Sequence, residues 1–230
     1  MIVGATVGGV LIAGAAAHGA FHRNSPIFGK PITRAPGDGL VVSLTFDDGP
    51  NPNATPAILD ALGERGVKAT FFILGKHAER WPDLTRRVAE EGHEVGNHGW
   101  FHRKLHFKSP AYVRDDLTRG TRAIEQVTGV HPHLFRAPHG FRSPWVTRVA
   151  SSLGQRTVGW SLGVWDSDRP GANVIAERTV SGAKPGSILL LHDGDGYDPD
   201  GDRRQTAQAV PMIVDRLLAK GFRFTTLSSH

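Results

Sequence analysis

Short runs of β-branched, aromatic and leucine residues recur along the chain, and stretches with an apolar residue every three or four positions separate most of them. Near-continuous apolar runs are typical of strands that are covered on both faces. The apolar periodicity of the stretches between these runs is typical of helices that pack one face against a sheet, as with Ile58, Ala61 and Leu62. The predicted strands span residues 41–46, 67–74, 93–98, 133–138, 155–161, 187–192 and 222–227. This alternation indicates a parallel α/β architecture, either a barrel or an open sheet.

Two segments precede the predicted folded domain, which we place at residues 40–230. Residues 1–23 are mostly apolar or small, and no Asp, Glu, Lys or Arg occurs from Met1 to Phe21. Residues 24–39 are rich in Pro and Gly, which is typical of a linker.

The apolar segment 1–23 has features of an export signal or a membrane anchor, and Ala15-Ala16-Ala17 offers a small-residue cleavage site. No basic residue precedes the apolar run, however, and its length and Gly/Ala content are marginal for a membrane span. A buried N-terminal helix or a start-site artefact therefore remains an alternative. We expect an exported protein, or one anchored to the membrane through this segment, in the cell envelope.

Titratable residues stand at the ends of the predicted strands. Because the carboxyl ends of parallel strands meet at one rim of the sheet, these side chains are expected to lie together there. Each has an ordinary structural interpretation as well: an acidic turn, a chance histidine pair among 12 histidines, a structural ion pair, or a histidine at the edge of the core. Their shared position on one rim favours a functional site. The titratable residues at these strand ends are Asp47, Asp48, His98, His102, Arg136, Asp166 and His192.

These side chains allow metal-assisted hydrolysis of an amide or ester. Two histidines and one carboxylate can hold a divalent ion with open positions for water and substrate. A second carboxylate can take a proton from water, a protonated histidine can donate one to the leaving group, and an arginine can orient the base.

Composition narrows the chemistry further. The absence of cysteine excludes thiolate zinc sites, iron–sulfur clusters and cysteine nucleophiles. No GxGxxG or P-loop signature is present, which disfavours nucleotide chemistry. A net charge of +5 favours acidic partners, but the basic residues form no run, so we expect no nucleic-acid binding. We expect a monomer.

Five ordered motifs resemble those of the polysaccharide deacetylase family, also called carbohydrate esterase family 4 or the NodB-homology group. The resemblance covers roughly residues 40–227. It implies a distorted (β/α) barrel, usually with seven parallel strands, and hydrolysis of N-acetyl groups from N-acetylglucosamine polymers. The motifs are TFDDGP (45–50), HGWFH (98–102), RAPHG (136–140), WSLGVWD (160–166) and LLH (190–192).

The resemblance also implies a role for individual residues. Asp47 would be the general base, paired with Arg136, and His192 the general acid, tuned by Asp166. One divalent ion would be bound by three further residues, with zinc preferred over cobalt or nickel. Another four residues would contact the acetylated sugar. The implied metal ligands are Asp48, His98 and His102, and the implied substrate-binding residues are Pro138, His139, Trp160 and Leu190.

The chain departs from the family pattern at several positions. Gly99 stands where Ser or Thr is common, which is expected to loosen the metal loop, and His139 replaces an aromatic residue. The fourth motif is the weakest match, so that Asp168 competes with Asp166 as partner of the acid. His106 is an alternative metal ligand.

The substrate is open at this level. An anionic envelope glycan such as peptidoglycan is favoured over free chitin, with chitooligosaccharides and an acetylated exopolysaccharide as alternatives. Hydrolysis of another non-peptide C–N bond or of O-acetyl esters on a glycan is the alternative activity. A carbohydrate-binding protein without turnover is a third interpretation, which the intact Asp47 and His192 disfavour. The loop 193–206 is expected to shape the cleft.

Overall fold

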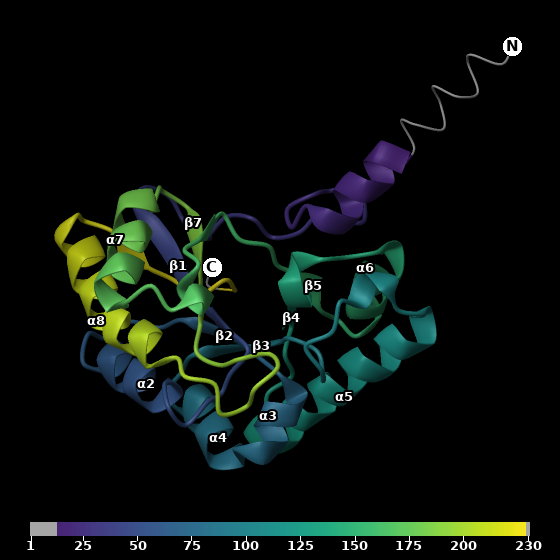
Figure 1. Ribbon diagram of the computed structural model, residues 1–230, viewed down its shortest axis with the longest axis horizontal. Coiled ribbons are helices and arrows are strands. Elements are labelled where there is room, and N and C mark those ends of the chain that lie inside the picture. Colours follow the sequence, from purple (N-terminus) through teal and green to yellow (C-terminus); the bar gives the residue numbers. More distant parts are fainter. Residues whose placement is uncertain (1–12, 229–230) are drawn as a thin grey trace, which may run out of the picture.

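A single parallel sheet forms the centre of the protein, which is described here from a computed structural model for residues 13–228. The strands follow the order β5-β4-β3-β2-β1-β7-β6, and β8 pairs with the start of β1. The sheet is curled, with β1 and β7 on one side and β4 and β5 on the other (Figure 1). The strands are β1 Val41–Asp47, β2 Thr70–Ile73, β3 Glu94–Asn97, β4 Leu134–Phe135, β5 Arg156–Thr157, β6 Leu162–Gly163, β7 Ser187–His192 and β8 Arg223–Phe224.

The predicted parallel barrel is confirmed, with one difference in strand number. The predicted strand 155–161 is a two-residue strand, β5, followed by a crossing segment, and β6 was not predicted at all. The crossing segment links β4 to β7, because the Val158 N–H donates to Phe135 O and the Ser161 N–H donates to Ile188 O. Strands of two residues are too short to carry a periodic pattern.

Helices cover the outer face of the curled sheet (Figure 1). The largest apolar core lies between the strands and these helices, and a smaller one packs α5 and α6 against β4. The helices are α2 Thr55–Gly63, α3 Gly75–Arg80, α4 Pro82–Glu90, α5 Pro110–Thr128, α6 Pro144–Ser152, α7 Ala172–Gly182 and α8 Arg204–Ala219, with short 3-10 turns at Leu105–Phe107, Pro138–Gly140 and Asp166–Asp168.

Strand β1 shows how the sequence pattern directs side chains to the site. Its seven residues are all buried, and side chains alternate between the two faces of a strand. Leu44 and Phe46 lie in the outer core. Thr45 and Asp47 have the opposite parity, and both accept hydrogen bonds from Arg136 inside the barrel. The same alternation therefore builds the core and delivers a carboxylate to the rim.

The residues before β1 pack on the domain. Residues 13–21 are helical, and the predicted linker 24–39 contacts the barrel at several points. Ile32 pairs with Val158, and the Ala35 N–H donates to Gly186 O. Within residues 13–228 no helix combines the length and hydropathy needed to cross a bilayer. Residues 1–12 of the predicted export or anchor segment, which spans residues 1–23, lie outside the described residues.

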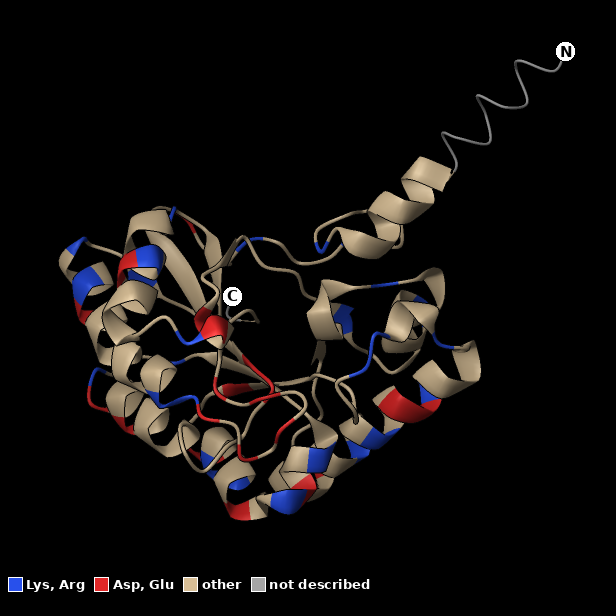
Figure 2. Ribbon diagram, viewed as in Figure 1, with Lys and Arg blue, Asp and Glu red and all other residues tan. Residues whose placement is uncertain are grey.

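Charged side chains of both signs are interspersed along the outer helices α5, α7 and α8 (Figure 2). Several of them form surface ion pairs, such as Arg65 with Asp215 and Arg216 with Glu177. Exposed pairs of this kind contribute little to stability. The N-terminal helix before β1 carries no charged residue in its described part (Figure 2).

Candidate active site

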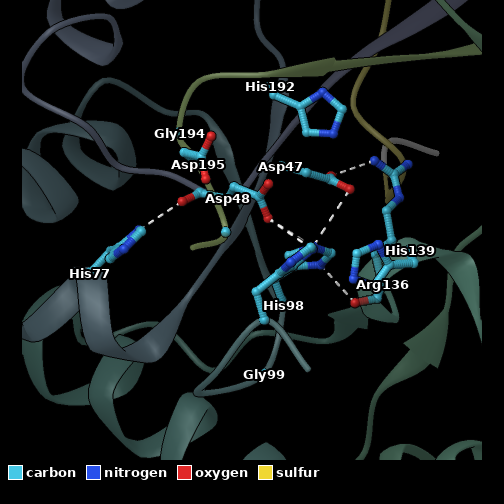
Figure 3. A network of polar contacts seen from close by, with 12 residues as sticks. Asp47, Asp48, His77, His98, Gly99, Arg136, His139, His192, Gly194 and Asp195 are labelled. Carbon is cyan, nitrogen blue, oxygen red and sulfur yellow. Dashed lines mark hydrogen bonds and ion pairs between the residues drawn. The ribbon is translucent and has the colours of Figure 1, made fainter. Parts of the chain in front are cut away.

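Three ligand-type side chains meet at the carboxyl end of the sheet, and Figure 3 shows two of them, Asp48 and His98. Asp48 follows β1, while His98 and His102 belong to the loop after β3. The Nε2 atoms of both histidines lie 3.3 Å from Asp48 Oδ1, and one ligand atom from each residue falls within 4.8 Å of the others. All three side chains are buried, so the structure brings together the predicted triad.

The triad fits a divalent cation. Asp48 Oδ1 is buried without a hydrogen-bond donor, which is costly unless a cation or proton compensates. His98 Nδ1 lies 2.8 Å from the carbonyl of Arg136, to which it donates. This bond leaves the lone pair of Nε2 directed at Asp48, as metal ligation requires.

The electrostatics of the triad also favour a cation. Burial opposes ionisation of Asp48, but His102 and His98 outweigh it and hold the pKa of this carboxyl far below its usual range. Burial lowers the pKa of His102 to about 3, against the attraction of Asp48. An ionised carboxylate next to the neutral imidazole of His102 is the ligand state that a divalent metal needs. Burial lowers the pKa of His98, but Asp47 and Asp48 outweigh this effect and raise it, so these two carboxylates attract positive charge to the triad.

Asp47 lies beside the triad and is held by a buried arginine (Figure 3). Arg136 Nη1 donates to Asp47 Oδ1 at 2.7 Å and to Thr45 Oγ1 at 2.9 Å, and Nη2 donates to Gly159 O at 3.1 Å. The guanidinium also lies 4.1 Å from the centre of the Phe72 ring. Burial lowers the pKa of Arg136, and Asp47 opposes this effect. Asp47 Oδ2, 3.8 Å from His98 Nε2, remains directed at the centre.

His192 faces this group from the end of β7, and Asp166 holds it. The Nδ1 atom donates to Asp166 Oδ1 at 2.9 Å, while the His192 N–H donates to Asp166 Oδ2 at 2.8 Å. Thr206 Oγ1 donates to the same carboxylate at 2.9 Å. Burial lowers the pKa of His192, but the charge of Asp166 outweighs it, and the pKa rises to about 9. Asp168, the predicted competitor, is exposed, so the contacts select Asp166.

The metal loop is held more firmly than the sequence indicated. Gly99 has a φ of +83°, and a Cβ atom there would lie 2.5 Å from Asp116 Oδ2. Asp116 accepts the N–H groups of Trp100 and Phe101 at 3.0 and 3.1 Å, and Asn97 Oδ1 accepts that of Gly99 at 2.8 Å. The expectation that Gly99 loosens the loop is therefore wrong, because a carboxylate occupies the place of the missing side chain.

A cavity of about 510 Å³ opens onto these groups. Three of the four predicted substrate-binding residues, His139, Trp160 and Leu190, line it, together with Asp47 and His192. The fourth, Pro138, is buried and does not belong to the lining. The predicted alternative ligand, His106, packs instead against the rings of Phe21, Phe107 and Phe141 and is not part of the ligand group.

Several residues at the site have contacts that the sequence did not predict. His77 Nδ1 donates to the backbone carbonyl of Asp48 at 2.7 Å, and burial lowers its pKa to about 4. Asp193, whose pKa burial raises to about 7, accepts the hydroxyl of Thr55. Tyr197, on the loop after β7, shares a hydrogen bond of 2.9 Å with His139. None of these contacts has a local sequence signal, since each joins residues far apart in the chain.

A parallel barrel that gathers a ligand triad, a carboxylate and an ion-paired histidine at its strand ends has the arrangement of a metal-dependent hydrolase. A sequence model of the polysaccharide deacetylase family matches residues 34–158. A peptidoglycan-N-acetylglucosamine deacetylase from Bacillus cereus is 37% identical over 198 residues, covering 84% of this chain and 89% of the relative. A chitooligosaccharide deacetylase from Bradyrhizobium is 38% identical over 195 residues, covering 81% and 88%. The chain therefore belongs to the polysaccharide deacetylase family.

Solved structures agree with this assignment. The crystal structure of a peptidoglycan N-acetylglucosamine deacetylase matches with a TM-score of 0.79 and 33% identity, over 85% of this chain and 90% of that one. A pseudoenzyme of carbohydrate esterase family 4 from Bacillus anthracis matches with a TM-score of 0.78 and 26% identity, over 86% and 67%. The fold is thus shared by proteins with and without turnover, and activity has to be argued from the residues of the site.

Proposed function

We propose that this protein is a metal-dependent deacetylase that removes N-acetyl groups from an N-acetylglucosamine-containing polysaccharide. The observation that carries the proposal is that Asp47 and His192 line the same cavity as His98 and His102. The two histidines of the lining form the ligand triad with Asp48. A binding protein without turnover would need neither a buried arginine on the first carboxylate nor an ion pair that keeps the histidine protonated. Both are present.

Asp48, His98 and His102 would hold one divalent ion, which we propose to be zinc because two imidazoles and one carboxylate suit it. When bound, this ion supplies Lewis acidity that lowers the pKa of water and stabilises negative charge. Three protein ligands leave coordination positions open. Two hydrogen bonds to the backbone orient the ligands. His77 donates to the carbonyl of Asp48, and His98 donates to the carbonyl of Arg136.

Asp47 would act as the general base. Its Oδ1 accepts a hydrogen bond from Arg136, so the carboxylate is oriented, and Oδ2 is directed at the centre. Water attacks the acetyl carbonyl carbon as Asp47 takes one of its protons. The departing nitrogen then needs a proton, and a second group has to donate it.

His192 would act as the general acid. Its Nδ1–H is bound to Asp166, so the proton on Nε2 is the one available to the cavity. With a pKa of about 9 the imidazole is protonated at neutral pH. Transfer of this proton to the nitrogen accompanies cleavage of the C–N bond, and the products are acetate and a glucosamine residue.

The finer assignments rest on the relatives and on charge. Relatives are named for peptidoglycan and for chitooligosaccharides, and a net charge of +5 favours an anionic polymer. We therefore propose peptidoglycan as the preferred substrate and the cell envelope, reached by export or anchoring, as the location. We propose that the protein acts as a monomer and binds no nucleic acid.

Acetate release from purified peptidoglycan and from N-acetylglucosamine oligomers tests the proposal. The full chain is assayed after chelation, and again after addition of zinc or cobalt. Release that disappears with chelator and returns with metal is expected. Metal-independent release would contradict the role of the triad. Metal binding without release from either substrate, but with release from O-acetylated xylan or a small cyclic amide, would replace N-deacetylation by the alternative activity.

A further inference from the structure

The residues that precede the family domain dock against the mouth of the catalytic cavity. We call residues 18–29 the N-terminal arm. Arg23 Nε and Asn24 Nδ2 each donate to Trp160 O at 3.0 Å, and the Arg23 guanidinium lies 5.1 Å from the Trp160 ring centre. Trp160 itself lines the cavity. The arm is therefore joined to a wall of the site and not to a remote surface.

A buried arginine of the domain depends on this arm. Arg142 is 1% exposed, and its guanidinium donates to Ser25 O at 2.6 Å and to Gly29 O at 3.3 Å. Its backbone N–H donates to Ala20 O at 3.0 Å. Among residues 13–228 no carboxylate pairs with Arg142, and burial lowers its pKa. Without the arm's carbonyls this cation would lack its partners, so the arm is an integral part of the fold.

Two glycines of the domain accommodate the arm closely. A Cβ atom on Gly159 would lie 2.1 Å from Asn24 Oδ1, and one on Gly140 would lie 2.9 Å from Arg23 Cβ. Gly140 belongs to the motif that carries His139. The barrel is thus shaped to receive the arm at the position where substrate-binding residues are found.

The docked arm places an aromatic ring in line with the catalytic centre. The ring centres of His102 and His139 are 4.4 Å apart, those of His139 and Phe141 are 5.8 Å apart, and those of Phe141 and Phe21 are 5.4 Å apart. Phe21 ends this row and is 52% exposed. Phe21, His22 and Arg23 all line the catalytic cavity. Exposed aromatic faces beside polar groups suit stacking on a sugar ring.

We propose that Phe21 and Arg23 of the N-terminal arm form a sugar-binding subsite next to the catalytic centre. It would bind a residue of the acetylated amino-sugar chain that neighbours the reacting sugar, with Phe21 stacking on its face. This inference rests on the proposed function for the identity of the ligand. The subsite is a specificity element that lies outside the matched family region, residues 34–158.

Substitution of Phe21 in the full, zinc-loaded chain tests the subsite. Phe21→Ala is expected to raise KM for an N-acetylglucosamine hexamer about three- to ten-fold, the range expected for one lost aromatic contact. The kcat value and the turnover of the monosaccharide are expected to stay within about two-fold, since neither needs the neighbouring sugar. Phe21→Trp is expected to retain the wild-type KM, which a loss of fold would not allow.

Trp145→Ala is the matched control, because Trp145 is an exposed aromatic residue, 44% accessible, that does not line the cavity. An unchanged hexamer KM in Phe21→Ala, equal to that of Trp145→Ala, would overturn the inference. Calorimetric binding of the hexamer in an Asp47→Asn background separates this outcome from failure of the proposed function. If no acetate is released by the parent protein, weaker hexamer binding after Phe21→Ala still supports the subsite, and equal binding refutes it.

Discussion

The ion pair between His192 and Asp166 makes the strongest prediction about pH dependence. Asp166 is 1% exposed, and it accepts from His192 Nδ1, from the His192 backbone and from Thr206. Burial lowers the pKa of His192 and Asp166 raises it, with smaller contributions from Asp48 and Asp47, so that it reaches about 9. Asp166→Asn removes the charge while retaining a side chain of nearly the same shape.

The magnitude follows from the pKa. A rise from the ordinary 6.5 to about 9 corresponds to about 3 kcal/mol in favour of the imidazolium. With the charge of Asp166 removed and the burial retained, the pKa of His192 is expected to fall to about 6.5 or below. At pH 7.5 the protonated fraction then falls from about 97% to about 10% or less, which lowers kcat/KM about ten-fold or more through protonation alone.

The sign of the pH effect is fixed by the role of the acid. A general acid works in its protonated form, so kcat/KM is retained below the pKa of His192 and is lost as the pH rises through it. The basic limb of the profile is therefore expected near pH 9 in the parent protein and about two units or more lower in Asp166→Asn. The assay is acetate release at low substrate concentration between about pH 5 and pH 10.

Asp168→Asn is the control, because Asp168 lies two positions further along the chain and is exposed. Its profile is expected to match that of the parent protein. A basic limb that stays in place in Asp166→Asn would show that His192 is not the acid whose ionisation limits the reaction. Equal shifts in both variants would show that the effect is a general one of net charge.

Three further predictions concern the base and the metal loop. Asp47→Asn is expected to retain zinc binding, measured by calorimetry, but to lower kcat by several orders of magnitude, and an unchanged kcat would exclude Asp47 as the base. His98→Ala is expected to abolish tight zinc binding while His106→Ala retains it, because only His98 belongs to the ligand group; the reverse result would reassign the triad. Gly99→Ser is expected to lower the melting temperature and weaken zinc binding, since a side chain there meets Asp116 at a positive φ; an unchanged protein would show that the loop shifts without cost.

The sequence was sufficient for the parts of the fold that long, regular patterns encode. Strands β1 and β7 have seven and five buried residues, and both were predicted within one residue of their bounds. Strand β6 has only two residues, and the crossing at Val158–Ser161 is fixed by hydrogen bonds to β4 and β7 that no local pattern encodes. Ordered motifs at strand ends predicted the triad, because topology alone brings the ends of parallel strands together.

Supporting contacts were beyond the sequence for a different reason. The hydroxyl of Thr55 reaches Asp193 and the ring of His77 reaches the backbone of Asp48 across loops whose course depends on the finished fold. The segment 24–39 has the composition of a linker, yet Ile32 and Ala35 pair with the barrel backbone. A high content of Pro and Gly describes irregular backbone, and irregular backbone can still be packed.

Gly99 shows why a departure from a family motif needs its structural partner before it is interpreted. Taken alone, the loss of a hydroxyl from the metal loop indicates a weaker site. The structure supplies Asp116 from α5, which accepts two N–H groups of that loop and occupies the space that a side chain at position 99 would need. Burial raises the pKa of Asp116 to about 6, against the two backbone donors. The carboxylate is therefore costly to bury, and its cost is offset only while both donors remain in the loop conformation that places His98 and His102 on Asp48. The metal loop and the Asp116 carboxylate thus stabilise each other, and Gly99 leaves the space that this carboxylate needs.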